Sequence, residues 1–398
     1  MQYLATHLVL SATDLSNFLG CRHRTSLEMD AAAKLRTKPH HTDPLLELLF
    51  ARGLAHEKAY VEQLRAEGRE IFDLGDTSDG PSRVDATLRA MRESADVIVQ
   101  GALGHGHWGG KPDILFRIST PSAFGAWSYE VADTKLAQET RAGTILQLGL
   151  YSELLATVQQ LVPEHFRVVT PNSDHPVHTF RVNDYAAYVR LVRDQLLSTV
   201  ALTSAEIFAQ YYPEPVELCH ICPWTGLCIQ KRIDDDDLSL VANITRTQRR
   251  ELDARGARTL TALGRLPLPL AFKPDRGSVD SYVRAREQAR LQLDSRGKNP
   301  PLHELRDIIP SEGLSRLPQP SQGDVFLDLE GDNIAFEGGR EYLFGLVTLD
   351  ANNNPEYRAY WGLSDADERE SFEAVIDLID ATILFSYTHL TLPTNREV

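Results

Sequence analysis

The sequence predicts an α/β protein in which a mixed sheet is flanked by helices. Short apolar runs bounded by turn-forming residues, which are typical of strands, alternate with stretches whose apolar residues recur every three or four positions, as in helices. The chain has 398 residues, which is more than a single hydrophobic core usually organises. We therefore expect two or three domains.

The first elements are two helices. Residues 11–14 resemble a capping box before a short helix that ends at Gly20 and Cys21, and a longer helix is expected over 44–67. Strands follow at 97–99, 114–116, 129–136, 165–170 and 177–182, with a turn over 104–110 and helices around 146–155 and over 184–210. These elements form an α/β core of about 200 residues, a common domain size.

Composition limits the class of protein. Hydrophobic residues make up 42% and charged residues 24% of the chain, as in globular proteins, and no apolar run reaches the length of a membrane span. The N-terminus lacks the basic start and cleavage site of a signal peptide. We expect a cytoplasmic protein with no membrane partner, in which clustered thiols indicate a metal rather than disulfides.

Charge and proline mark the later domain boundaries. Four adjacent aspartates at 234–237 favour solvent, and prolines between 300 and 320 suggest a linker. The net charge of −15 disfavours nucleic acid, but 246–298 holds 13 Lys or Arg against 6 Asp or Glu. That stretch is either a phosphate-contacting surface or a solvated helical face. The expected units are 1–232, a basic helical region with linker over 238–320, a β-rich unit over 321–385, and a tail over 386–398.

Two carboxylates and a lysine form the candidate catalytic group. Asp133 and Lys135 stand two apart on an expected strand and share a face, and Asp113 begins the neighbouring strand. Two acids brought together repel, which favours a raised pKa or a bound Mg²⁺ or Mn²⁺. A salt-bridged strand is the ordinary alternative.

The order of four motifs resembles the RecB-like branch of the PD-(D/E)xK nucleases over about residues 10–230. The motifs are Gly53-x-x-His56, Pro112-Asp113, Asp133-Thr134-Lys135 and Gln147-x-x-x-Tyr151. The resemblance implies a restriction-endonuclease-like mixed sheet, with His56, Asp113, Asp133 and the Thr134 carbonyl holding the metal. It also implies that Lys135 is the catalytic lysine and that Gln147 and Tyr151 position the strand being cut.

Each of these residues also has an ordinary structural explanation. A lone histidine on an apolar helix face is usually a core residue, and Gln147 and Tyr151 fit any amphipathic helix. Glu57 and Glu130 are alternative carboxylates. Because Glu130 points to the strand face opposite Asp133, we expect it to face solvent.

The four cysteines are Cys21, Cys219, Cys222 and Cys228, so three lie within ten residues. This spacing suits Zn²⁺ or an iron–sulfur cluster, and His220 or His23 could replace one thiolate. One cysteine before the core and three after it resembles the iron–sulfur nucleases of the AddB and CRISPR-adaptation types. That resemblance implies a [4Fe-4S] cluster joining the two ends of the domain, although Arg22 stands where relatives often have proline.

Three C-terminal segments carry further resemblances. Residues 244–263 resemble a helix-hairpin-helix unit. Residues 325–332 resemble the first motif of DnaQ-like, ribonuclease-H-fold 3′–5′ exonucleases, which implies that Asp328 and Glu330 bind Mg²⁺; the later motifs are missing, so we expect a truncated, inactive domain. Residues 386–394 resemble translated sequencing-adapter sequence, so natural sequence is expected to stop near 385; a helicase region often follows in relatives.

Together these patterns predict a Mg²⁺-dependent DNA nuclease acting on single strands or ends in DNA repair or recombination. One alternative is a non-catalytic, cluster-stabilised nucleic-acid-binding module. Another is 3′–5′ exonuclease activity from Asp328 and Glu330 in a complete C-terminal domain.

Overall fold

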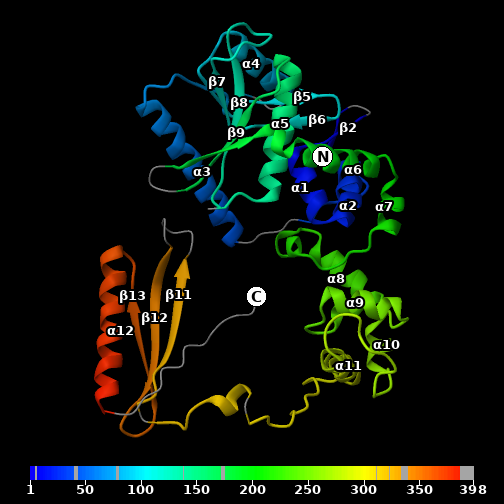
Figure 1. Cartoon of the computed structure of the whole chain (residues 1–398), viewed down its shortest axis with the longest axis vertical. Helices are drawn as coiled ribbons and strands as arrows, with labels where there is room; N and C mark the ends of the chain where they lie inside the picture. The colour runs from blue at the N-terminus through cyan, green and yellow to red at the C-terminus, as the bar shows by residue number, and fades with distance from the viewer. Residues whose placement is uncertain are drawn as a thin grey trace. The chain divides into compact units, whose positions relative to one another are not determined.

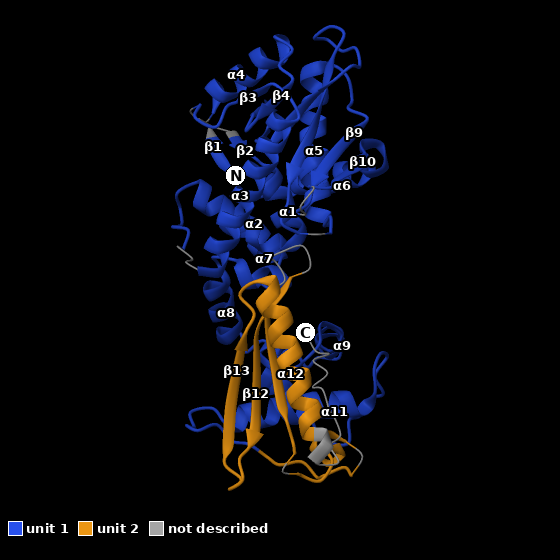
Figure 2. Ribbon diagram, turned by 90° about the vertical axis from the view of Figure 1, so that its left-hand side faces the viewer, with its two compact units in different colours: residues 1–171, 175–303 blue, residues 172–174, 304–398 orange. Residues whose placement is uncertain are grey.

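The computed structural model describes residues 1–4, 7–39, 44–77, 80–137, 139–171, 175–310, 312–321, 323–332 and 339–385. The chain forms two compact units (Figure 2). The first contains Met1–Pro171 and His175–His303, and the second begins at Glu304. The expected non-native tail, 386–398, lies outside the described residues.

The first unit alternates strands and helices along the chain. Its strands are β1 (Gln2–Leu4), β2 (His7–Val9), β3 (Ile71–Asp73), β4 (Val97–Val99), β5 (Leu103–His105), β6 (Trp108–Gly110), β7 (Ile114–Ile118), β8 (Ser128–Thr134), β9 (His165–Val169) and β10 (Val177–Arg181). Its helices are α1 (Ala12–Gly20), α2 (Arg22–Ala32), α3 (Pro44–Ala66), α4 (Pro81–Arg92), α5 (Ala142–Gln159), α6 (Val182–Val200), α7 (Ser204–Gln210), α8 (Thr225–Asp234), α9 (Arg246–Ala254), α10 (Leu260–Gly264) and α11 (Val279–Asp294), with 3-10 turns η1 (Glu217–Ile221) and η2 (Leu238–Leu240).

A six-stranded mixed sheet is the centre of this unit, in the order β10-β9-β8-β7-β4-β3. The β9–β8 and β4–β3 pairs are parallel, and the other pairs are antiparallel. The mixed α/β architecture expected from the sequence is therefore confirmed.

Side chains alternate between the two faces of the sheet, because successive residues of a strand point to opposite sides. On β8, Val131 belongs to the large core with α1, α5 and α6, whereas Ala132 belongs to a smaller core under α3. The helices α3 and α5 thus cover opposite faces (Figure 1). Asp133 shares the face of Val131, the one covered by α5.

Most expected elements are confirmed, with specific corrections. Ser11 and Asp14 form the capping box of α1, and the 44–67 helix is α3. The expected turn over 104–110 is instead the β5–β6 hairpin, which bonds to Leu10. The single helix expected over 184–210 is broken, because Thr203 caps a new helix, α7. The elements β1, β2, α2, β3, α4 and α8 were not expected from the sequence.

The basic helical region folds around a core of its own. Leu252 of α9, Leu263 of α10 and Tyr282 of α11 are buried together. Gly256, whose φ of +90° suits glycine, turns the chain between α9 and α10. Two helices joined by a turn therefore occupy the segment in which a helix-hairpin-helix unit was expected. A role of this segment in nucleic-acid binding stays a prediction.

The second unit is a three-stranded antiparallel sheet with one helix. It contains η3 (Gly313–Arg316), β11 (Phe326–Asp332), β12 (Arg340–Leu349), β13 (Pro355–Trp361) and α12 (Asp365–Phe385), with strand order β11-β12-β13. Val375 of α12 packs on Phe344 and Leu346 of β12. Asp328 and Glu330 are exposed on β11.

None of the helices in the described part of the chain combines the length and apolar content needed to cross a lipid bilayer.

Candidate functional site

The acidic group lies where β7 begins and β8 ends. The antiparallel register pairs Ile114 with Ala132, which brings Asp113 next to the last residues of β8. The backbone N–H and the hydroxyl of Thr134 donate to Asp113 Oδ2 at 3.0 and 3.2 Å. Asp113 is thereby held beside the Asp133-Thr134-Lys135 segment, as the sequence motif predicts.

Asp133 is completely buried and has polar partners both on α5 and within its own motif. Gln147 Nε2 of α5 donates to its Oδ1 at 3.1 Å, and Lys135 Nζ forms an ion pair with its Oδ2. Burial and then the neighbouring Asp113 raise the pKa of Asp133 to about 8, although Lys135 opposes this effect. A buried carboxyl beside a second, half-buried one is costly to ionise with a single lysine nearby, and a bound divalent cation relieves that cost.

Tyr151 completes the part of the site contributed by α5. It is buried, and burial followed by the nearby Asp133 raises the pKa of its hydroxyl. Its ring lies against Gly110 of β6, where a Cβ would come within 2.2 Å of the ring. A side chain at position 110 would therefore displace Tyr151 from the acids.

The structure adds Glu57, which the sequence ranked only as an alternative. Burial and then the Asp113 charge raise its pKa, with a smaller opposing effect from Lys135. Gln100, which follows β4, donates a hydrogen bond to Glu57. The only feature of the sequence that pointed to Glu57 was its position directly after His56.

His56 lies at the same end of the sheet but has a different partner. Its Nε2 is 3.3 Å from the carbonyl oxygen of Val169, which also accepts the Lys135 backbone N–H. Its ring lies 5.1 Å from that of His175. With Nε2 facing a carbonyl, ligation through this nitrogen needs a turn of the ring, so the ligand role of His56 stays a prediction.

The sequence predicted that Glu130 faces solvent, but the structure buries it. It is only 2% exposed, accepts the His165 backbone N–H at 3.0 Å and pairs with Arg167 at 2.6 Å. The expectation was wrong because α3 covers this face of the sheet as well, so both faces of β8 are buried. Glu130 holds β9 to β8.

The raised pKa of Asp133 predicts a pH-dependent stability. The unfolded carboxyl ionises near 3.8 and the folded one at a higher pH, so the metal-free folded protein should lose stability as pH rises from about 4 to 8. Asp133→Asn should remove this loss, so its melting temperature in EDTA should exceed that of the wild type by a margin that grows between pH 5 and 8. Asp85→Asn, at an exposed position of α4, is the matched control. Parallel melting curves for Asp133→Asn and wild type across this range would contradict the interpretation.

The four cysteines line one cavity. Cys21 lies between α1 and α2, Cys219 and Cys222 bracket the end of η1, and Cys228 is on α8. Burial and then neighbouring thiols raise the pKa of Cys228 to about 12. Thiols crowded in this way are costly to ionise unless a cation binds, so the donor set fits a thiolate-ligated metal or cluster.

At three of the four sulfurs, nearby backbone N–H groups lower the cost of ionising the thiol. The Val216 N–H donates to Cys219 Sγ at 3.4 Å. Burial dominates the raised pKa of Cys21 and Cys222, but amides near each sulfur, from Arg24 and from Trp224, lower it. N–H groups aimed at sulfur stabilise thiolates and bound clusters.

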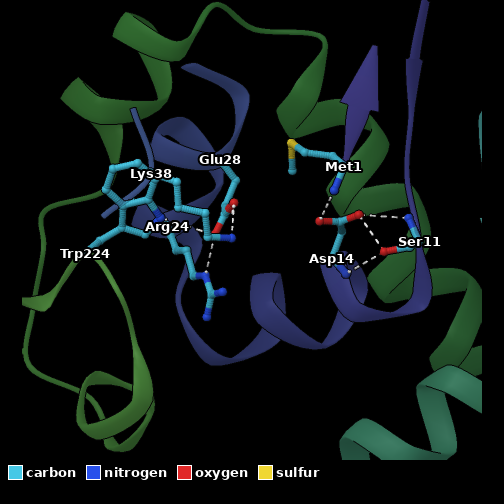
Figure 3. Close-up of polar contacts among 7 residues, drawn as sticks. All are labelled: Met1, Ser11, Asp14, Arg24, Glu28, Lys38 and Trp224. Carbon is cyan, nitrogen blue, oxygen red and sulfur yellow. Dashed lines mark hydrogen bonds and ion pairs between the residues drawn. The ribbon is translucent and has the colours of Figure 1, made fainter. Parts of the chain in front are cut away.

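Glu28 of α2 ties the two cysteine-bearing segments together, as Figure 3 shows. It accepts the Trp224 indole N–H at 3.1 Å and pairs with Arg24 at 3.0 Å and Lys38 at 2.9 Å. Trp224, between Cys222 and Cys228, is buried against Leu27. Residues almost 200 positions apart are thus held together by protein contacts alone.

Ion pairs partly neutralise the basic helical region. Glu251 pairs with Arg255, Asp253 with Arg258, and Glu287 with both Arg286 and Arg290. These pairs favour the solvated-face interpretation of the stretch. A phosphate-contacting role stays a prediction.

Comparison with known proteins adds no family. The chain matches no protein-family model and none of the curated proteins. Within the described ranges, no three His, Cys, Asp or Glu side chains already surround a point as ligands of one metal ion.

Proposed function

We propose that the chain is a Mg²⁺-dependent DNA nuclease of the RecB-like PD-(D/E)xK type, with a restriction-endonuclease-like sheet and a [4Fe-4S] cluster on its four cysteines. One observation carries the proposal. The completely buried Asp133 lies beside Asp113 and contacts both Lys135 and Gln147, which come from separate motifs.

The site residues would have different roles in catalysis, according to the chemistry of their side chains. Asp113 and Asp133 would hold Mg²⁺, which when bound supplies a Lewis acid for the scissile phosphodiester. Lys135 places a cation at the site and would stabilise negative charge that develops on the phosphate oxygens. Gln147 and Tyr151, one turn apart on α5, would orient the DNA strand, and Glu57 adds a carboxylate from α3.

The cysteine cluster would act as a structural staple. Joining Cys21 to Cys219 closes a loop that contains the whole sheet, and loop closure restricts the unfolded chain. The cluster lies on elements other than the strands carrying the acids, so it would stabilise the domain rather than take part in hydrolysis.

A cleavage assay on the full chain tests the proposal. A 5′-labelled single-stranded oligonucleotide should be cut with Mg²⁺ and left intact with EDTA, and Asp113→Asn should lower the rate by roughly 100-fold or more. Asp328→Ala should leave cleavage unchanged, because Asp328 is exposed in the second unit. Loss of cleavage in Asp328→Ala alone would assign the activity to that unit, and DNA binding without any cleavage would support the non-catalytic alternative.

A further inference from the structure

Gln100 is the residue at which β4 leaves the central sheet, next to the acidic group. Its backbone N–H donates to the carbonyl oxygen of Asp113 at 2.8 Å, one step beyond the paired residues Val99 and Ile114. Its side-chain Nε2 donates to Glu57 Oε1 on α3. A single residue therefore contacts both the segment that carries Asp113 and the carboxylate that α3 adds to the site.

The backbone of Gln100 has a conformation that glycine usually adopts. Its φ is +54°, in the left-handed region, where a residue with a Cβ is held at a cost in free energy. Such a conformation persists where surrounding contacts fix it. Arg83 of α4 is buried and donates to the carbonyl oxygens of Gln100 at 3.4 Å and of Gly75 at 3.0 Å. What glutamine adds over glycine at this position is the side-chain amide, and the partner of that amide is Glu57.

Glu57 lies among charges of both signs. Burial raises the pKa of Glu57, Asp113 raises it further, and Lys135 opposes this with a smaller effect, so both charges act on Glu57. Repulsion from Asp113 favours rotation of this long, half-buried side chain away from the site. A hydrogen bond from a neighbouring group holds a carboxylate in place, as is usual for carboxylates that ligate metals.

We propose that Gln100 is a positioning residue of the acidic site, which holds the Glu57 carboxylate in place for the bound divalent cation and so strengthens the binding of that ion. This inference rests on the proposed metal-dependent function. Gln100→Gly removes the amide and suits the backbone conformation, so the fold should be retained.

The chain offers a closely matched control in Gln160→Gly. Gln160 is also a glutamine in the left-handed region, with a φ of +53°, and it ends α5 at an exposed position. The same substitution is therefore made at the same backbone conformation, without a contact to Glu57. Both variants should keep a melting temperature close to that of wild type.

Mn²⁺ binding to the full chain without DNA tests the inference, with free Mn²⁺ measured by electron paramagnetic resonance. Gln100→Gly should weaken binding by roughly 10-fold and raise the Mg²⁺ concentration for half-maximal cleavage by a similar factor. Gln160→Gly should match wild type in both measurements. Glu57→Gln should weaken Mn²⁺ binding to a similar extent, and the double variant with Gln100→Gly should bind no more weakly, because Gln100 acts through Glu57.

The outcomes separate this inference from the nuclease proposal. If Gln100→Gly binds Mn²⁺ as tightly as wild type, or if the losses from the two substitutions add, the positioning role is wrong and the nuclease stands. If Gln100→Gly does not fold, wild-type affinity in Glu57→Gln also overturns the inference. Mn²⁺ binding that Gln100→Gly weakens, in a protein that cuts no DNA, supports the positioning role and overturns the nuclease. Wild type that neither binds Mn²⁺ nor cleaves DNA overturns both.

Discussion

Lys135→Ala should abolish Mg²⁺-dependent cleavage while leaving the protein folded. Lys135 follows β8 directly, its ammonium pairs with the buried Asp133, and its side chain is 30% exposed. It is therefore the cation of the acidic group that remains accessible to a phosphate. Removing a charge that stabilises the reacting phosphate lowers turnover by roughly 100-fold to 1,000-fold. The measurement is the cleavage rate of a labelled oligonucleotide at saturating Mg²⁺.

The control for this prediction is Lys58→Ala. Lys58 is an exposed lysine on α3, next to Glu57 in sequence, and the substitution removes the same charge. It should retain cleavage close to wild type. Lys135→Ala should also keep the melting temperature within a few degrees of wild type, which separates lost chemistry from lost folding. Full activity in a folded Lys135→Ala protein would refute the catalytic assignment.

Cys222→Ser should produce the largest loss of stability. Cys222 is buried at the shared cavity, and a serine hydroxyl is a poor ligand for iron or zinc in place of a soft thiolate. Loss of the proposed metal would release a loop of almost 200 residues, and by the loop-closure relation this would lower the free energy of unfolding by on the order of 4 kcal/mol. For a unit of this size the melting temperature should fall by roughly 10 °C. Calorimetry measures the melting temperature, and iron and sulfide assays measure the content of the cluster.

Ile221→Ser is the matched control, because Ile221 lies in the same turn but is 50% exposed. It should keep both the metal and the melting temperature. The Cys222→Ser protein should remain folded at low temperature, since the contacts of Glu28 with Trp224 and of His23 with Tyr211 persist. If wild type stripped of metal melts at the same temperature as the loaded protein, the staple role is wrong.

The sequence alone determined the local features of this protein. The capping box at Ser11, the helix over Pro44–Ala66 and the strands at Val97–Val99 and Ile114–Ile118 follow from propensity and periodicity. The motif residues Asp113, Asp133, Lys135, Gln147 and Tyr151 were singled out because their order resembles that of a nuclease family, and the structure brings them together. Such features depend on neighbours within one or two elements, which a sequence pattern describes well.

Only the tertiary structure decided which surfaces are covered and which side chains meet across elements. Periodicity showed that Glu130 and Asp133 face opposite sides of β8, but not that helices bury both sides. Likewise, His23 and His220 each stand one or two residues from a cysteine, yet packing of α2 against α7 buries only His23. The physical reason is that burial and pairing depend on contacts between residues far apart in sequence. Those contacts form only when the sheet order and the helix packing are established.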